Sequence, residues 1–357
     1  MIPFNASIFC IRPSASIREA IAAIDRSCKG IMLVTDEAGI LQGTITDGDI
    51  RRAMLVGENL DAPVTILLKR KKTSRYSKPV TAPIGTDPAE LLCIMHEKIV
   101  HQIPLLDGEG RVAGLITMDD LLPDQILPLQ TVVMAGGFGQ RLRPLTEGMP
   151  KPMLKVGDRP ILQRMIEQLK SVGIRRVNLT THYRGDLIKE HFGDGKKFGM
   201  DICYVNEDQP LGTAGVLGLI TPSHEPLLVI NGDIMTEVNF GALLHFHKEH
   251  KADMTVAVRA YEMSIPYGVV ESDGVEITHI SEKPMIRHFI NAGIYLINPD
   301  ICQSLPKGEA FDMPDLITKL VLEKRRVISF PIREYWLDIG RIEDYQKAQD
   351  DEAKRKI

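Results

Sequence analysis

A glycine-rich string followed by cations is the strongest candidate for chemistry in this sequence. Residues 134–152 read MAGGFGQRLRPLTEGMPKP. Arg141 adds a planar guanidinium that can bind two phosphate oxygens at once. Lys151, between Pro150 and Pro152, adds a compact ammonium on a backbone that the prolines make rigid. Three glycines let backbone N–H groups approach an anion closely: Gly136, Gly137 and Gly139. We therefore expect the string to bind phosphate groups.

The elements that must position this string alternate between strand and helix. Apolar residues recur at helical spacing after Pro160, and Gly173 ends that stretch. The order of strand, loop, helix and strand favours a βαβ unit and a parallel sheet, with a binding crevice at the strand ends. We expect strands over residues 131–135, 177–180, 227–230 and 254–259, and helices over 161–172 and 240–250.

The string resembles the signature of the sugar-phosphate nucleotidylyltransferase family. The resemblance covers roughly residues 131–347 and implies a Rossmann-like α/β domain with a mixed, mostly parallel sheet. Six further stretches typical of the family follow in the expected order: LGTAG at 211–215, NGD at 231–233, YGVV at 267–270, EKP at 282–284, NAGIY at 291–295 and WLDIG at 336–340.

The resemblance implies that Asp233 and Asp338 hold magnesium. The chemistry agrees, because Mg²⁺ takes oxygen ligands and is usually held by one or two carboxylates together with substrate phosphates. Asp233 directly follows an apolar strand, and Asp338 lies in the strand-like run 335–339 beside the single tryptophan. A single aspartate at a strand end is more often a cap or a turn residue. Because a phosphate-binding string occurs in the same sequence, the pair of aspartates is more consistent with a metal-binding role.

The same resemblance assigns binding roles to residues on either side of the metal. Each group also has a simpler interpretation, such as a plain turn for the glycines after Leu211 or an exposed loop cation for Lys283. The residues expected at the nucleotide are Ala135, Gly136, Gly137, Gly139, Glu207, Gly212 and Thr213. The residues expected at the sugar phosphate are Gly268, Glu282, Lys283 and Asn291.

The implied reaction joins a nucleoside triphosphate to a sugar 1-phosphate and releases pyrophosphate. The attacking phosphate has a second pKa of about 6 and is therefore ionised at neutral pH without a general base. The obstacle is the repulsion between two polyanions. Arg141, Lys151 and magnesium would cancel that repulsion and stabilise the transition state.

The N-terminal part of the sequence contains an internal repeat. Residues 31–51 and 103–122 share an apolar strand, an acidic turn with glycine, a second strand, and Thr-x-x-Asp at the start of a helix. They resemble a tandem pair of CBS domains, a smaller α+β module over about residues 7–125. The resemblance implies contacts to an adenine nucleotide, AMP or ATP, from Thr46, Asp49, Thr117 and Asp120. Helix capping is the competing explanation, and the basic run 69–72 is either a solvated linker or a phosphate contact.

Length and composition fit two domains with no unusual partner. The 357 residues divide into a CBS pair over 1–127, with repeats at about 7–62 and 73–127, and a catalytic domain over 128–357. The net charge of −4 argues against nucleic acid, and no apolar run approaches the ~18 residues of a membrane span. Five scattered cysteines favour buried, reduced thiols and a cytoplasmic location. The CBS pair favours a homo-oligomer.

Three alternatives stay open on the sequence. A dehydrogenase is disfavoured, because two arginines and several prolines follow the glycines where a dinucleotide-binding loop would enter a helix. A catalytically silent sensor of sugar nucleotides is disfavoured by the retained Arg141, Lys151, Asp233 and Asp338. The resemblance favours GTP with mannose 1-phosphate or glucosamine 1-phosphate, with Glu207 or Asp208 at the guanine edge, over UTP, dTTP or CTP.

Overall fold

The computed structural model describes residues 6–72, 77–121, 127–207, 209–221, 223–306 and 308–355. The chain separates into two compact units, Met1–Gln125 and Ile126–Ile357, and each is described by itself. Asp208 and most of the proline-containing connector lie outside the described residues. Within the described residues, no helix combines the length and the apolar character that a membrane crossing requires.

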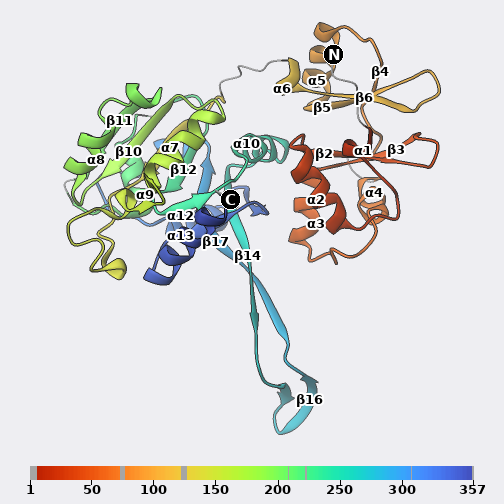
Figure 1. The fold of residues 1–357 in the computed structure, drawn as a ribbon. Helices are drawn as coiled ribbons and strands as arrows, with labels where there is room; N and C mark the ends of the chain where they lie inside the picture. Colours follow the sequence, from red (N-terminus) through yellow and green to blue (C-terminus); the bar gives the residue numbers. More distant parts are fainter. Residues whose placement is uncertain are drawn as a thin grey trace. The chain divides into compact units, whose positions relative to one another are not determined.

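The first unit contains two copies of one small α+β fold (Figure 1). Each copy has a three-stranded sheet in the order β1-β2-β3 or β4-β5-β6, in which the first pair is parallel and the second antiparallel. The elements are α1 (Ala6–Phe9), β1 (Cys10–Ile11), α2 (Ile17–Ser27), β2 (Ile31–Thr35), β3 (Leu41–Thr46), α3 (Asp47–Leu55), α4 (Thr65–Lys71), β4 (Ala82–Pro83), α5 (Pro88–Lys98), β5 (Gln102–Leu106), β6 (Val112–Thr117) and α6 (Met118–Leu121).

The two copies contact each other through their hairpin turns. The N–H of Leu41 donates to the carbonyl of Gly110 at 3.3 Å, and the N–H of Val112 donates to the carbonyl of Gly39 at 3.1 Å. The Nζ atom of Lys29 in the first copy lies 2.5 Å from Oδ1 of Asp120 in the second. The repeat found in the sequence is thus a structural repeat with matching strand order.

The second unit is built on a seven-stranded sheet with the order β11-β10-β7-β12-β17-β14-β18. All neighbouring strands are parallel except those that pair with β17, so the expected mixed, mostly parallel α/β sheet is confirmed. The strands of this sheet are β7 (Gln130–Met134), β10 (Arg176–Thr181), β11 (Asp201–Asn206), β12 (Leu227–Asn231), β14 (Met254–Ser264), β17 (Met285–Ile297) and β18 (Val327–Ile332).

Shorter strands and helices complete the second unit. The two-stranded pieces are β8 (Lys155–Val156) with β9 (Arg159–Pro160), β13 (Ile234–Thr236) with β19 (Trp336–Asp338), and β15 (Val269–Asp273) with β16 (Glu276–Ser281). The helices are η1 (Gln140–Leu142), η2 (Lys151–Met153), α7 (Ile161–Ser171), α8 (Gly185–Phe192), η3 (Lys196–Phe198), α9 (Gly212–Gly215), η4 (Val216–Leu219), α10 (Phe240–Glu249), α11 (Pro299–Gln303), α12 (Met313–Leu322) and α13 (Ile342–Arg355).

Alternating residues of the central strand β7 separate the core into two layers. Val133 packs in the cluster that contains Leu162 and Met165 of α7, whereas Val132 packs in the cluster that contains Leu316 of α12. Successive side chains of a strand point to opposite faces, so both faces of the sheet are covered. Parallel strands covered on both faces hold the strand ends, and the loops that follow them, in fixed positions.

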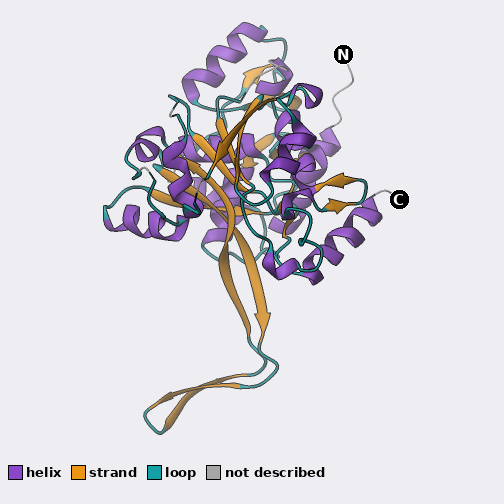
Figure 2. Ribbon diagram, turned by 90° about the vertical axis from the view of Figure 1, so that its left-hand side faces the viewer, coloured by secondary structure: helices purple, strands orange, loops and turns teal. Residues whose placement is uncertain are grey.

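A long two-stranded ribbon leaves this sheet. β14 and β17 stay paired from Met254 with Ile297 to Ser264 with Met285, and β15 and β16 form a second hairpin at the far end. Figures 1 and 2 both show the ribbon projecting from the body of the second unit. We call residues 261–289 the arm.

The cysteines are free thiols, as expected, but the expectation that they are buried is wrong for most of them. Cys302 is buried, whereas Cys28, Cys93 and Cys203 are exposed. Cys93 and Cys203 lie on the exposed faces of α5 and β11, and Cys28 is the residue that caps the end of α2. The spacing of the cysteines alone does not reveal these positions.

Candidate active site

The glycine-rich loop follows the central strand β7 and is held in a tight conformation. Gly139 adopts a left-handed φ of 62°, and a Cβ atom there would lie 3.0 Å from Thr146 Cγ2 and 3.2 Å from Lys151 Cβ. The hydroxyl of Thr146 donates to the carbonyl of Gly139 at 2.8 Å. Glycine is required at this position both for the backbone angle and for the close approach of Lys151.

Leu142 fixes the loop to the body of the unit. Its side chain is fully buried with Leu154, Leu337 and Ile339, which belong to other segments of the site. The neighbouring Arg141 and Arg143 are exposed. Burial of one leucine between two arginines therefore directs cations to the surface while the loop stays anchored.

Lys151 and the two aspartates form the charged centre of the site. The Nζ atom of Lys151 lies 2.5 Å from Oδ2 of Asp233 and 4.0 Å from Oδ1 of Asp338. Lys151 is only 8% exposed, and a buried ammonium is costly unless an anion and hydrogen bonds compensate it. Asp233 supplies that compensation, which explains why the cation can sit in a buried position.

A short antiparallel ladder places the two aspartates side by side. Ile234 of β13 pairs with Asp338 of β19, and the N–H of Ile339 donates to the carbonyl of Asp233 at 3.0 Å. Burial and the charge of Asp233 raise the pKa of the Asp338 carboxyl, although Lys151 and Arg141 act in the opposite direction. The site thus concentrates negative charge beside buried and exposed cations.

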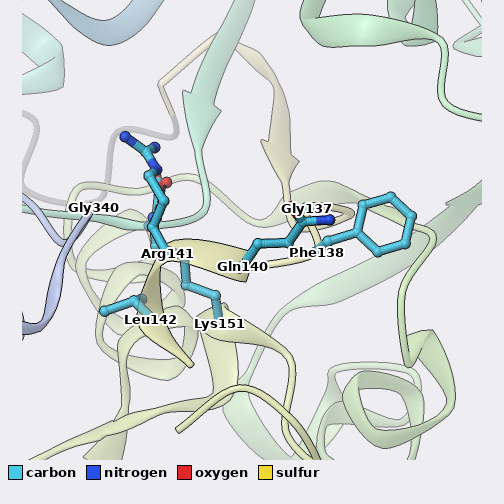
Figure 3. A pocket seen from close by; sticks show the side chains of 9 residues that line it. Gly137, Phe138, Gln140, Arg141, Leu142, Lys151 and Gly340 are labelled. Atoms are coloured by element: carbon cyan, nitrogen blue, oxygen red, sulfur yellow. Dashed lines mark hydrogen bonds and ion pairs between the residues drawn. The ribbon is translucent and has the colours of Figure 1, made fainter. Parts of the chain in front are cut away.

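A pocket of about 550 Å³ opens over this centre. Figure 3 shows the side chains of Arg141 and Phe138 extending in different directions from the loop. The residues that line the pocket are Gly137, Phe138, Gly139, Gln140, Arg141, Leu142, Lys151, Asp233 and Gly340. Backbone N–H groups, two cations and a carboxylate in one hollow suit a polyphosphate and a divalent cation.

The first glycine of the loop lies close to one other expected nucleotide residue, Glu207, and to the backbone of His182. A Cβ atom at Gly136 would lie 3.1 Å from Oε1 of Glu207 and 3.3 Å from the backbone nitrogen of His182. Nδ1 of His182 lies 2.9 Å from the carbonyl oxygen of Glu207, and the ring packs edge-on against Phe138 at 5.4 Å. The structure therefore groups Gly136, Glu207 and His182, while Oε2 of Glu207 accepts from the N–H of Leu211 at 3.1 Å.

Gly212 and Thr213 lie against a different segment. The N–H of Thr213 donates to Oδ1 of Asp312 at 3.0 Å, and its hydroxyl accepts from the N–H of Met313 at 2.8 Å. A Cβ atom at Gly212 would lie 2.6 Å from Oδ1 of Asp312. In this structure both residues connect α9 to the start of α12, which matches the simpler interpretation of a turn.

The four expected sugar-phosphate residues are divided between two places. Asn291 lies where β17 leaves the body, and its side chain donates to the hydroxyl of Tyr295 at 2.8 Å. Gly268, Glu282 and Lys283 lie on the arm, where a Cβ atom at Gly268 would be 3.1 Å from Oε2 of Glu282. Gly268 and Glu282 therefore lie close together on the arm, which projects from the body of the second unit (Figures 1 and 2).

Sequence reasoning gave no role to Asn231, which lies two residues before Asp233. It is the last residue of β12, and a Cβ atom at Gly293 would lie 2.6 Å from its Nδ2. Among the residues that the structure describes, no donor reaches its buried Oδ1 atom. A buried acceptor without a partner needs an explanation, and its position in the NGD stretch was the only sequence signal.

In the first unit, the expected nucleotide contacts cap helices. Thr46 and Asp49 form a reciprocal capping box at the start of α3, and Oδ2 of Asp49 lies 2.7 Å from Nζ of Lys71. In the second copy, Oδ2 of Asp120 accepts from the hydroxyl of Thr117 at 2.7 Å. The capping interpretation is therefore seen in the structure, and Lys71 of the basic run has an internal partner.

The donor set at Asp233 and Asp338 fits magnesium. No group of three or more His, Cys, Asp or Glu side chains that could hold a metal occurs among the residues described. Mg²⁺ does not need such a group, because it keeps waters and takes its other ligands from substrate phosphates. The two carboxylates, held by one ladder at the edge of a phosphate-binding loop, meet that requirement.

Comparisons with known proteins agree with this fold and site. Residues 130–355 match the nucleotidyl transferase family, and residues 4–56 and 74–123 match the CBS domain family. The chain therefore belongs to the nucleotidyl transferase family and carries two CBS domains before the transferase domain. Both resemblances seen in the sequence are confirmed.

Several known proteins and solved structures are similar to this chain over about three fifths of its length. A mannose-1-phosphate guanyltransferase of Schizosaccharomyces pombe is 33% identical over 228 residues, which are 61% of this chain and 62% of that protein. A mannose-1-phosphate guanylyltransferase catalytic subunit beta of Danio rerio is 32% identical over 226 residues, which are 61% of this chain and 62% of that protein. The chain thus spans less than two thirds of the length of these relatives.

Two solved structures show the same fold. HddC from Yersinia pseudotuberculosis is 26% identical, with a TM-score of 0.50 over 62% of this chain and 98% of that one. A putative glucose-1-phosphate thymidylyltransferase from Bacillus anthracis is 24% identical, with a TM-score of 0.50 over 62% of this chain and 94% of that one.

Proposed function

We propose that this chain is a sugar-1-phosphate nucleotidylyltransferase, which converts a nucleoside triphosphate and a hexose 1-phosphate into a nucleoside diphosphate sugar and pyrophosphate. One observation carries the proposal: the Nζ atom of Lys151 lies 2.5 Å from Asp233 and 4.0 Å from Asp338 in a pocket lined by the glycine-rich loop. We place the boundary between the two domains at residues 127 and 128.

The reaction is an in-line displacement at the α-phosphorus. An oxygen of the sugar phosphate forms a bond to that phosphorus, the bond to the oxygen that bridges to the β-phosphorus breaks, and pyrophosphate leaves with the electron pair. Because the second pKa of a phosphate monoester is about 6, the nucleophile is ionised at neutral pH. The protein therefore needs to position and neutralise the reactants rather than to remove a proton.

Different residues of the pocket position the reactants and neutralise their charge. Backbone N–H groups of the glycine-rich loop orient the triphosphate, and the exposed Arg141 neutralises its outer oxygens. Lys151 is held in place by Asp233, so its charge is preorganised at the point where negative charge develops. Asp233 and Asp338 would hold magnesium, which supplies further positive charge to the phosphates.

We further propose GTP as the nucleotide, with mannose 1-phosphate before glucosamine 1-phosphate as the sugar. The names of the relatives from Schizosaccharomyces pombe and Danio rerio support this order. Glu207, beside Gly136, is the candidate for contact with the guanine edge. UTP, dTTP and CTP are the alternative substrates of the same reaction.

The experiment that tests the function measures pyrophosphate release from a matrix of four nucleoside triphosphates and several sugar phosphates, with and without Mg²⁺. We expect the highest rate with GTP and a hexose 1-phosphate, and none without a divalent cation. Nucleotide binding without pyrophosphate release from any pair would refute the enzyme and favour a sensor of sugar nucleotides.

A further inference from the structure

The two sides of the glycine-rich loop carry different chemistry. Asp233 lies just after β12 on one side of β7, whereas β10 and β11 lie on the other side in the strand order β11-β10-β7-β12. His182 directly follows β10, and Glu207 directly follows β11. All four strands are parallel, so their carboxyl ends meet at the edge of the sheet where α/β proteins bind ligands. The cations and carboxylates suit the phosphates, which leaves the side of His182 and Glu207 for the nucleoside.

Contacts on two sides of the ring hold His182 in place. Its Nδ1 atom lies 2.9 Å from the carbonyl oxygen of Glu207. Its ring packs edge-on against Phe138, a residue that lines the pocket, with the ring centroids 5.4 Å apart. The N–H of Glu207 also donates to the carbonyl of Thr181 at 3.2 Å, which joins the segments after β10 and β11. His182 is only partly buried, so a held ring stays accessible.

The hydrogen bond to Glu207 determines what the other ring nitrogen of His182 can do. A backbone carbonyl oxygen only accepts hydrogen bonds, so Nδ1 must carry the proton. In a neutral imidazole the second nitrogen then has a lone pair and no proton. Nε2 of His182 is therefore an acceptor, and within the described part of the chain no donor bonds to it.

Glu207 supplies a second acceptor beside the first glycine of the loop. Its Oε2 atom already accepts from the N–H of Leu211 at 3.1 Å. Its Oε1 atom faces Gly136, where an added Cβ would lie 3.1 Å from this oxygen and 3.4 Å from Cβ of His182. The absence of a side chain at Gly136 thus leaves open a space that both Glu207 and His182 border.

Two neighbouring acceptors match the base-pairing edge of one common nucleobase. Guanine carries two adjacent donors on that edge, N1–H and the N2 amino group. Adenine and cytosine carry one amino group next to a ring nitrogen that accepts, and uracil and thymine carry one N3–H between two carbonyl oxygens. An acceptor placed against an acceptor leaves polar groups unpaired, which costs more than a normal hydrogen bond contributes.

We propose that His182 is a specificity-determining residue, whose Nε2 accepts a hydrogen bond from the N2 amino group of guanine. Oε1 of Glu207 accepts from N1–H of the same base, because a carboxylate forms its stronger, charge-assisted hydrogen bond with the more acidic donor. The inference rests on the proposed function and deepens it. The base is assigned by the two acceptors beside Gly136, independently of what any relative uses.

Inosine triphosphate tests the contact, because it differs from GTP only in the missing N2 amino group. For the full-length wild type and His182→Asn, kcat/KM of pyrophosphate release with mannose 1-phosphate is measured with GTP and with ITP. The amide nitrogen of asparagine can replace Nδ1 at the carbonyl of Glu207, but it leaves no acceptor at the place of Nε2. We expect the wild type to prefer GTP about threefold to tenfold, the effect of one hydrogen bond. The variant should use both nucleotides equally, through a lower rate with GTP alone.

Tyr183→Phe is the matched control, because Tyr183 is adjacent to His182 and also holds the loop. Its hydroxyl donates to the carbonyls of Thr146 and Glu147 at 3.3 and 3.1 Å. Loss of these bonds acts on every nucleotide alike, so the GTP-to-ITP ratio should stay at the wild-type value. If His182→Asn keeps the wild-type ratio, or loses both rates by the same factor, His182 has only a packing role and the proposal is overturned.

Calorimetric titration with GTP and with ITP, without sugar phosphate, separates the inference from the function. A chain that binds GTP more tightly than ITP through His182, but releases no pyrophosphate with any sugar phosphate, refutes the function and supports the base contact. A chain that turns over UTP, dTTP or CTP faster than GTP refutes the role of His182 and leaves the reaction standing. A chain that binds neither nucleotide and releases no pyrophosphate refutes both.

Discussion

The Nζ atom of Lys151 lies 2.5 Å from Oδ2 of Asp233, although 82 residues separate the two in the chain. Lys151 begins a short helical turn between two prolines, and Asp233 follows the strand β12, a direct neighbour of β7 in the sheet. Parallel neighbours end at the same edge of a sheet, so the fold brings the cation and the carboxylate to one pocket. The pair is the point from which the catalytic predictions follow.

Removal of either partner should strongly reduce turnover. We expect Lys151→Ala or Asp233→Ala to lower kcat by on the order of a hundredfold or more, because each change removes preorganised charge from the transition state. Steady-state rates of pyrophosphate release measure the effect. Lys155→Ala is the matched control, because Lys155 is exposed and uses its carbonyl, which the variant keeps, to bind Tyr345 and Gln349; a rate near wild type for Lys151→Ala would contradict the assignment.

A methyl group at Gly139 should destabilise the loop. Gly139→Ala forces a left-handed residue with a side chain, at a cost of about 1–2 kcal/mol, and places Cβ within 3.2 Å of Thr146 and Lys151. We expect a lower Tm and a slower reaction. Gly137→Ala is the control for stability, since no atom lies within 4 Å of its added Cβ; equal Tm values for the two variants would refute the role assigned to Gly139.

The sequence predicted the elements whose apolar pattern is regular. Helix α7 covers Ile161–Ser171 where residues 161–172 were expected, with Ile161, Leu162, Met165, Ile166 and Leu169 all buried. The strands β7, β10 and β12 lie within one residue of the expected bounds at each end. Helical and strand periods are local properties, so a single stretch of sequence contains enough information to identify them.

The parts that the sequence did not predict depend on contacts between distant residues. Strand β14 was expected to end at residue 259 but continues to Ser264, because β17 pairs with it as far as that residue. Thr213 was assigned to the nucleotide, yet its contact is Asp312, 99 residues further on. Neither partner is visible from local spacing, because a strand or a turn receives its neighbour only from the tertiary fold.

The stability of the second unit should fall at mildly acidic pH because of His247. Its Nδ1 lies 2.8 Å from the hydroxyl of the fully buried Thr255, and its Nε2 lies 3.0 Å from Oδ1 of Asn298. Burial lowers the pKa of this imidazole below its ordinary value of about 6.5, and the hydrogen bond to Asn298 opposes the shift only in part. The unfolded chain therefore binds the proton more readily than the folded chain.

The direction of the pKa shift determines the pH range over which His247 changes the free energy of unfolding. The contribution of His247 is fully present above pH ~6.5 and is lost as pH falls from there through the lowered pKa of the folded state. Denaturant unfolding between pH 7.5 and pH 5 measures the slope. His247→Gln should flatten it, whereas His224→Gln, at an exposed residue, should leave it unchanged; parallel slopes for wild type and His247→Gln would count against the buried imidazole.

Adenine nucleotides should bind the first unit and change the activity of the second. Thr117 and Asp120 cap α6, and the side chain of Asp120 is one-third exposed, so its carboxylate can also meet a ribose hydroxyl. We expect AMP or ATP to raise the Tm of the first unit, as a ligand that binds only the folded state must, and to alter the rate of pyrophosphate release.

Two variants separate binding from capping in that experiment. Asp120→Asn keeps an acceptor for the capping bond but loses the charge that pairs with Lys29, and it should weaken the nucleotide-dependent shift in Tm. Asp87→Asn changes the N-cap residue of α5, whose side chain accepts from the N–H of Ala89; no nucleotide contact is proposed there, and the shift should stay intact. A chain that starts near Leu129 should lose the response of the rate to AMP and ATP. Identical kinetics with and without nucleotide in the full chain would show that the CBS pair does not regulate the reaction.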